Sequence, residues 1–462
     1  MRGAPEPGVS WKAMRDAALQ RFGGGLLGAL WMVGAGAAAS RVAATVKDIV
    51  VAHRFGTSDA YDAYLFAFAV PVFLAGSFRS AFFSAFVPRF LDAGVRRGPR
   101  EASDLLRKSL TVQIGVLVGL AALLAALAVP IVSLITRGFS PEKAELTARL
   151  MRALVPFVVL DGIAGIYGST LNARRRFAAA ALVSTLPPLA SLAAVVALAT
   201  PLGVNALVLG TLAGAALELL ASASLVRREG LSVAPTLSPY DPDAAALFRG
   251  FGILAWGAML MSANTVVDQA MATAAGSGSI AVIGYGAKIP AAVLGLAGVA
   301  LGAATLPHYA EMAAAKQWDE ISRSLRRHAI RIGLVALAGA CALAAVSRPL
   351  VGLLFQHGKF DAADTGRVAA VQAFYALQLP GYLVGIVAAR VLNALGRDRW
   401  ILAVSALNFV LNIGGNWLLL RWIGLPGIAL STATFYTVAA VVLLTLCRRA
   451  LRENRRKGHA PA

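Results

Sequence analysis

Residues 39–56 read ASRVAATVKDIVVAHRFG and close a long apolar run that begins near residue 25. A run of about 20 apolar residues is long enough for a helix to cross a bilayer. Yet this one carries Arg41, Lys47 and Asp48 at or near membrane depth. A charge at the centre of a membrane helix costs about 3 kcal/mol even on the lenient insertion scale. The stretch therefore predicts a membrane span whose charges serve a function.

The rest of the chain shares this apolar character. Of its 462 residues, 58% are hydrophobic and 14% are charged, and the mean hydropathy is +0.70. Soluble domains carry about a quarter charged residues, so the composition excludes an ordinary soluble protein. The fold class that it indicates is an all-α polytopic membrane protein.

Apolar segments predict twelve spans, in two groups of six divided by a polar linker. Six plus six is typical of transporters built from repeated halves, so we expect two six-helix lobes around a central cavity. The expected parts are a segment 1–24, an N-lobe 25–226, a linker 227–249, a C-lobe 250–447 and a basic tail 448–462. The spans are predicted at 25–52, 60–88, 109–136, 147–170, 178–200, 203–226, 250–275, 279–306, 329–355, 366–392, 399–420 and 425–447.

The formal net charge of +20 would suggest a nucleic-acid partner in a soluble protein. Here the basic residues lie in short loops, where they set the orientation of membrane helices. If the spans alternate, one side holds about 29 Lys and Arg and the other about 6, which makes the basic side cytoplasmic. We therefore expect both termini in the cytoplasm and no nucleic-acid partner.

Some basic residues lie inside the predicted spans. A lone cation near a helix end usually reaches the headgroups, which stays open for Lys47 and is favoured for Arg390. Arg41 and Lys288 lie deeper, one in each predicted lobe, and are expected to face a water-filled cavity. A cavity with excess positive charge selects an anion, and phosphate or pyrophosphate suits Arg and Lys best.

Sequence patterns of soluble enzymes are absent from the chain. It contains no GxxxxGK[ST] phosphate loop, no HExxH and no GxSxG. The sequence therefore predicts a transporter and not an enzyme, driven by an ion gradient, by the membrane potential or by removal of the product.

Several ordered motifs resemble those of one known family. SRVAATVKDIVVAHRFGTSDAYDAYLFAF, residues 40–68, resembles the S-R-x-x-G-x-x-R-D signature of the MurJ/MviN lipid II flippases. YGAKIP, residues 285–290, is similar to the family's Y-A-x-R-[IL] helix. LLFQHGKFDAADT, residues 353–365, is similar to its L-F-x-x-G-x-F-x-x-x-D-T loop. The resemblance covers residues 25–450 approximately.

This resemblance implies a fold and an activity. The fold is that of the MOP exporter superfamily, whose two lobes open alternately to each side of the inner membrane. The activity is movement of a polyprenyl-pyrophosphate-linked glycan from the cytoplasmic to the periplasmic leaflet, in peptidoglycan or polysaccharide biosynthesis. Ser40, Arg41, Asp48 and Asp62 match the family's positions, while Lys47 and Lys288 stand where it has arginine.

From these positions we expect a pyrophosphate site made of Arg41, Lys47, Arg79 and Lys288. Ser40, Asp48 and Asp62 would support it, the two acids by holding the cations when the site is empty. The chain departs from the family in having Ala75 and Gly76 at its arginine pair and Ala291 at an acid, and in having twelve predicted spans instead of fourteen.

These departures keep other functions open. One is a flippase for an exopolysaccharide or O-antigen repeat unit, another a non-transporting membrane scaffold, and a third a MATE-like antiporter. The expected partners are the lipid-linked glycan, membrane lipids and enzymes of glycan synthesis, with the chain itself a monomer. Na⁺ or H⁺ is the expected coupling ion, and a Na⁺ site or plain interhelical hydrogen bonding would account for Asn408, Asn412, Asp268 and Thr432, with Asn264 and Thr434 nearby.

Overall fold

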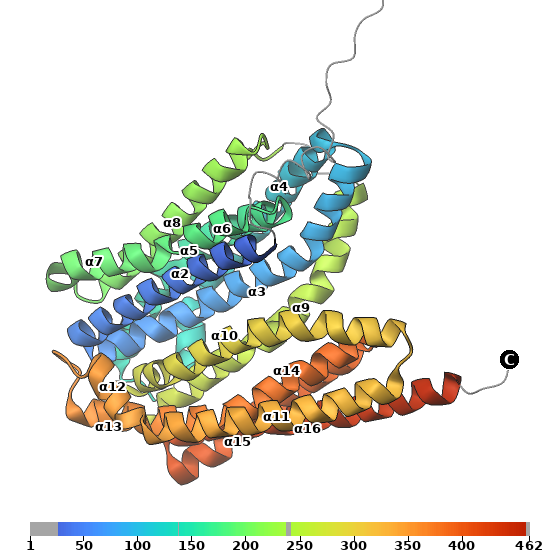
Figure 1. Cartoon of the computed structure of the whole chain (residues 1–462). Helices are drawn as coiled ribbons and strands as arrows, with labels where there is room; N and C mark the ends of the chain where they lie inside the picture. Colours follow the sequence, from blue (N-terminus) through green and yellow to red (C-terminus); the bar gives the residue numbers. More distant parts are fainter. Residues whose placement is uncertain (1–25, 137, 237–241, 459–462) are drawn as a thin grey trace, which may run out of the picture. The chain divides into compact units, whose positions relative to one another are not determined.

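The computed structural model describes residues 26–136, 138–236 and 242–458. In these residues the chain is helical almost throughout and forms no β-strand (Figure 1). The predicted segment 1–24 lies outside them. The helices are α2 (Leu26–Phe55), α3 (Asp59–Arg96), α4 (Pro99–Ile135), α5 (Pro141–Ala173), α6 (Phe177–Val183), α7 (Leu186–Leu202), α8 (Asn205–Arg228), α9 (Pro242–Ala272), α10 (Ser279–Ala314), α11 (Trp318–Ala345), α12 (Ser347–Phe355), α13 (Ala362–Ala376), α14 (Gln378–Ala394), α15 (Asp398–Ile423) and α16 (Leu425–Gly458), with a short 3-10 turn, η1 (Thr273–Ala275).

Ten helical segments of the described chain are long and apolar enough to cross a membrane. They coincide with ten of the predicted spans, and the first and seventh predicted spans are helical as α2 and α9. The prediction of an all-α polytopic membrane protein is therefore confirmed. Several helices continue past their apolar part, and α16 runs to Gly458 because its Arg-rich end still favours helix in water.

Three predicted spans are divided by a break. The fifth breaks between α6 and α7, the ninth between α11 and α12, and the tenth between α13 and α14. Each new helix carries a proline in its first turn: Pro187, Pro349 and Pro380. A proline fits there because the first N–H groups of a helix have no helical acceptor, but it ends the helix before it.

The described chain forms two compact units, and each is assembled from several segments. Because a long helix can belong to one unit at one end and to the other at its other end, the units do not follow chain order. The predicted lobes, 25–226 and 250–447, stay a prediction. Within the described residues, unit 1 comprises 26–48, Leu74–Ala125 and Leu154–Trp256, and unit 2 comprises Ile49–Phe73, Ala126–Ala153 and 257–458.

Unit 1 is packed around an aromatic row on α3. Phe82, Phe86 and Phe90 follow one another at helical spacing, with ring centroids 4.7 Å and 5.1 Å apart. All three side chains are almost fully buried. Elsewhere in this unit α7 and α8 approach closely at glycine, because a Cβ at Gly214 would lie 2.6 Å from Cα of Pro187. Small residues of this kind let membrane helices pack backbone to backbone.

Part of the predicted linker packs against unit 1. Leu231 is 4% exposed, and the hydroxyl of Tyr167 donates to the carbonyl of Val233 at 2.9 Å. The hydroxyl of Thr111 accepts from the amide of Thr236 and donates to its carbonyl. Residues 231–236 are therefore tied to α4 and α5 by hydrogen bonds, while Ala234 and Pro235 within them stay exposed.

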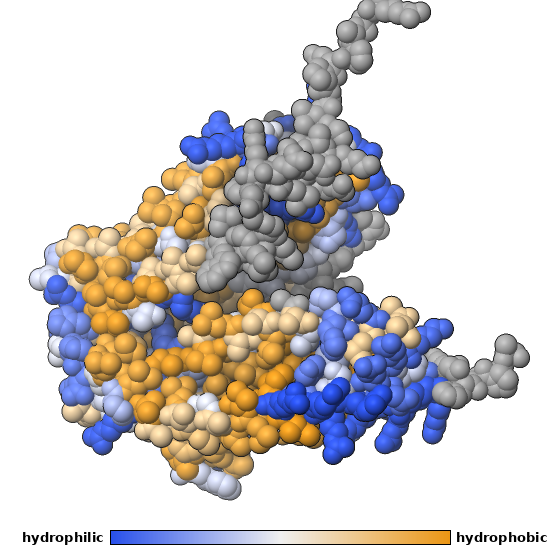
Figure 2. Space-filling model, in the orientation of Figure 1, coloured by the Kyte–Doolittle hydropathy of each residue, from blue (hydrophilic) through white to orange (hydrophobic). Residues whose placement is uncertain are grey.

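Unit 2 has its core between α14, α16 and the helices beside them. A Cβ at Gly381 of α14 would lie 2.7 Å from the backbone nitrogen of Thr437 in α16, so these two helices touch through their backbones. Figure 2 shows an apolar surface over the helices of this unit, with hydrophilic residues at its two ends. This distribution is what a bilayer-crossing bundle requires.

Candidate functional site

Ser40 and Arg41 lie on α2 beside the break between α6 and α7. The hydroxyl of Ser40 donates to the carbonyl of Ser184 at 3.0 Å. In an unbroken helix that carbonyl would accept from residue 188, but Pro188 has no N–H. Ser40 therefore supplies the hydrogen bond that the proline removes, and it fixes this part of α2 against unit 1.

The side chain of Arg41 is exposed on α2 and makes no ion pair in the described part of the chain. Lys47, two turns further on, contacts Asp48 at 2.7 Å, and the side chain of Asp48 is 6% exposed. Asp48 is thus paired with Lys47, one of the predicted cations. That Arg41 and Lys47 bind a ligand stays a prediction.

Arg79 of α3 lies between two acids of unit 1. Its Nη2 is 2.8 Å from Oε1 of Glu218 and 3.3 Å from Oδ1 of Asp161. Gly165 of α5 makes room for it, because a Cβ there would lie 2.8 Å from Cγ of Arg79. The predicted pyrophosphate ligand therefore already has two carboxylates around it. An incoming anion would have to compete with them.

Asp62 has partners that the sequence did not predict. Its fully buried carboxylate accepts from Nζ of Lys143 at 2.9 Å and from the backbone amide of Ala281, in the first turn of α10, at 2.8 Å. Lys143 also contacts Asp59. The structure therefore gives Asp62 a structural partner within unit 2 instead of the cations assigned to it.

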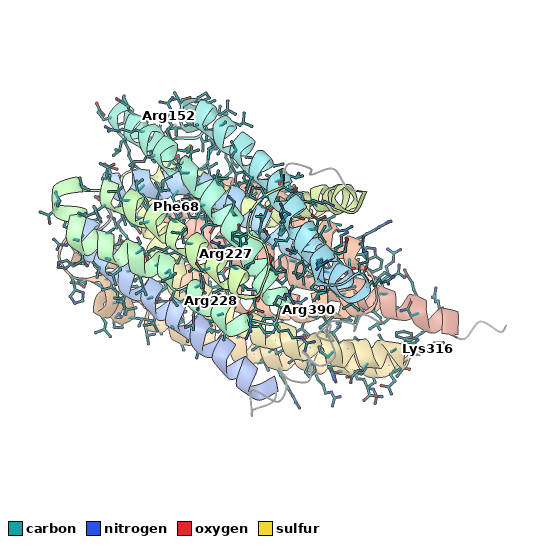
Figure 3. The ribbon with its side chains drawn as sticks, turned by 90° about the horizontal axis from the view of Figure 1, so that it is seen from above. Phe68, Arg152, Arg227, Arg228, Lys316 and Arg390 are labelled. Atoms are coloured by element: carbon teal, nitrogen blue, oxygen red, sulfur yellow. The ribbon has the colours of Figure 1, made fainter. Side chains whose placement is uncertain are left out.

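Lys288 lies on α10 in unit 2 and is exposed. Pro290 follows two residues later and leaves the carbonyl of Gly286 without its helical donor. The other three predicted cations belong to unit 1, so the common cavity stays a prediction. Arg390, labelled in Figure 3, was expected to reach the headgroups and is half-buried on α14. It packs against Gly302, where an added Cβ would lie 3.1 Å from Nη2 of Arg390.

A carboxylate of α9 meets two amides of α15. Oδ1 of Asp268 accepts from Nδ2 of Asn412 at 2.9 Å and from Nδ2 of Asn416 at 2.7 Å. Both asparagines are 0% exposed. Asn416 was missed, although it continues the four-residue spacing of Asn408 and Asn412 on one helix face.

This cluster has unused acceptors. The Oδ1 atoms of Asn264, Asn408, Asn412 and Asn416 are buried and accept no hydrogen bond in the described part of the chain. Thr432 of α16 is 6% exposed, and its hydroxyl donates to the backbone carbonyl of Ile428. Amide and carboxylate oxygens are hard ligands, so the donor set fits an alkali cation. Within the described residues no group of three His, Cys, Asp or Glu side chains forms a second candidate.

Known proteins resemble the chain in sequence and in fold. The family model described as "Lipid II flippase MurJ" matches residues 51–460. A "Probable lipid II flippase MurJ" of Synechocystis is 25% identical over 442 residues, covering 89% of this chain and 79% of that protein. The "Lipid II flippase MurJ" of Burkholderia cenocepacia is 26% identical and covers 75% and 69%.

Solved structures resemble the fold. "Lipid II flippase MurJ, inward closed conformation" superposes with a TM-score of 0.77 at 21% identity, covering 91% of this chain and 89% of that one. An inward-facing MATE transporter of the MOP superfamily reaches 0.73 at 15% identity, covering 90% and 96%. The fold is thus of the MOP type, and the family match over most of its length shows that the chain belongs to the lipid II flippase MurJ family.

Proposed function

We propose that this protein moves lipid II from the cytoplasmic to the periplasmic leaflet of the inner membrane for peptidoglycan biosynthesis. Family membership supports the activity. The observation that carries the site is Arg41, an arginine on a membrane helix that makes no ion pair in the described residues. A pyrophosphate carries the charge that would offset its cost.

Each residue of the proposed site has a role that its position allows. Arg41 contacts the pyrophosphate first, and Ser40 holds its helix in place. Lys47 adds a second positive charge, oriented by Asp48. Arg79 joins when the anion draws it from Glu218 and Asp161. Lys288 completes the site from α10 in one state of an alternating-access cycle.

The protein is a multi-pass inner-membrane protein, and we propose that it transports without catalysing a reaction. No bond of the lipid needs to be broken, since flipping moves the same molecule between leaflets. Its direct partners are then the lipid-linked glycan and the membrane lipids. We further propose a monomer with both termini in the cytoplasm, as the basic loops predict, and transient contacts with enzymes of glycan synthesis.

Na⁺ is the proposed coupling ion, with H⁺ on the same carboxylate as the alternative. Asp268 would supply the charge, and the free amide oxygens of Asn408, Asn412 and Asn416 would supply further ligands. Thr432 would join only after turning from its present acceptor. Each charge moved inward across the membrane is worth about 2.3 kcal/mol per 100 mV.

A flippase for another lipid-linked glycan is the second candidate. One observation favours it: Arg79, a predicted ligand of the pyrophosphate, is already held by two carboxylates. A different sugar on the pyrophosphate would contact the residues around Arg79 in a different way. Cationic drugs, by contrast, would be repelled by Arg41 and Lys47.

Depletion of the protein in its native host tests the proposal. Mass spectrometry of extracted lipids should show accumulation of lipid II followed by lysis. Wild-type protein should reverse both effects, as should the exposed-surface variant Arg96→Ala. Arg41→Ala at equal protein level should reverse neither. Accumulation of a different lipid-linked glycan with an intact wall would identify the second candidate instead.

A further inference from the structure

A groove of about 450 Å³ lies between the end of α4 and the first turns of α5. All of its lining belongs to unit 2. Neither the predicted pyrophosphate site nor the Asp268 cluster uses any of these residues. Its apolar wall includes Val129, Val132 and Ala148, and its charged side chains are Glu145, Arg149 and Arg152, the last of them labelled on α5 in Figure 3.

The two arginines of the groove form a pair. Arg149 and Arg152 are three residues apart on α5 and therefore lie on one helix face. Both are exposed, and neither makes an ion pair within the described residues. With one glutamate beside them, the groove carries an excess positive charge next to an apolar wall.

The wall of the groove includes an exposed apolar side chain, since Val129 is 46% exposed. Exposed apolar side chains on a membrane helix face acyl chains. Arg149 and Arg152 lie in the first two turns of the predicted span 147–170, so the arginines stand at the border of the hydrocarbon layer.

Membrane orientation does not account for these arginines. The α4–α5 connection is on the side with few basic residues, which the charge asymmetry makes periplasmic. Another basic residue of this region, Lys143, forms ion pairs with Asp59 and Asp62. Arg149 and Arg152 instead face the groove.

We propose that this groove is an exit-side site for the diphosphate head of the flipped lipid. It rests on the proposed function and adds a second site for the same substrate. Each arginine binds one phosphate, and the first isoprenoid units lie against Val129, Val132 and Ala148. Two cations at this spacing suit a diphosphate better than the single phosphate of a common phospholipid.

Binding of farnesyl diphosphate to the full-length protein in detergent tests the proposal. We would measure it in an Arg41→Gln background, which weakens the proposed central site, so that the change caused by groove substitutions reports the groove. Adding Arg149→Gln and Arg152→Gln should weaken this binding at least tenfold. Glu145→Gln should strengthen it several-fold, because it removes a repelling carboxylate. Arg348→Gln, an exposed arginine of α12 outside the groove, should leave it unchanged.

Other outcomes would overturn the proposal. Equal affinity with and without the groove arginines removes the site. Equal affinity for farnesyl monophosphate, or equal displacement by phosphatidylglycerol, removes the diphosphate assignment. The proposed function fails separately, if depletion does not raise lipid II, and that result leaves the groove measurement standing.

Discussion

Asp62 and Arg41 differ both in burial and in the partners that their charges have. Asp62 is 0% exposed and has two donors, whereas Arg41 is exposed and has no acid partner in the described chain. A charge without a partner is tolerated only where water or a ligand reaches it. Asp62 therefore has a structural role, while a substrate-binding role for Arg41 stays a prediction.

Replacing Lys143 by Met tests this structural role. It leaves the buried carboxylate of Asp62 without its counter-charge, and breaking a buried pair costs about 3–5 kcal/mol. Thermal unfolding of the purified protein should show a large loss. The double variant with Asp62→Asn should recover much of it, since the amide oxygen still accepts from Ala281. Arg96→Met, at an exposed pair, should change little; equal losses in both would contradict the argument.

The Asp268 cluster gives a second prediction at this scale. If Na⁺ binds there, NaCl should raise the unfolding temperature of the wild type above its value in KCl. At a concentration 100 times Kd the gain is about 2.7 kcal/mol. Asp268→Asn should abolish the difference while keeping the size of the side chain. Asp92→Asn, which changes an exposed acid, should keep the difference between NaCl and KCl. If Asp268→Asn also keeps this difference, the site is ruled out.

The sequence predicted some of these residues and not others. Arg41 and Lys288 stand out because a cation within an apolar run needs an explanation. The partners Glu218 and Lys143 do not, since they lie 139 and 81 positions from Arg79 and Asp62. Only the folded chain brings such residues together. Asn416 is intermediate, because its four-residue spacing from Asn412 was visible in the sequence.

At the scale of helices, hydropathy located the spans and left their breaks undetermined. A proline in an apolar run can kink a helix or begin a new one, and the sequence does not separate the two outcomes. The structure shows new helices at Pro187 and Pro380. At the first of these breaks, Ser40 binds the carbonyl left by Pro188. The break between α6 and α7 is therefore connected to α2 through Ser40.

Close packing of α7 on α8 gives a prediction for these elements. Gly214→Ala would place a Cβ 2.6 Å from the backbone of Pro187, so the two helices must separate. We expect a clear fall in the unfolding temperature. Gly119→Ala in α4 meets nothing within 4 Å and should be neutral or slightly stabilising, by up to about 1 kcal/mol. Similar results for the two variants would show that α7 and α8 do not depend on this contact.

At the scale of the whole molecule, the uneven distribution of basic residues among the loops predicts how the protein is oriented in the membrane. An alternating path puts the α10–α11 turn with the basic loops and the α12–α13 turn with the others. Gln317 and His357 are exposed in these two turns. Cys341 and Cys447 are first replaced by serine, and a single cysteine is then introduced at position 317 or at position 357.

The orientation then follows from labelling intact cells with a membrane-impermeant maleimide. His357→Cys should react from outside, and Gln317→Cys should react only after the cells are opened. The reverse pattern would turn the protein over and place the Arg149–Arg152 groove in the cytoplasmic leaflet, where the lipid is picked up. If both variants react from outside, the spans do not alternate as predicted. The even number of spans between the termini then loses its support. The same two variants therefore decide whether that groove receives the lipid before or after it crosses.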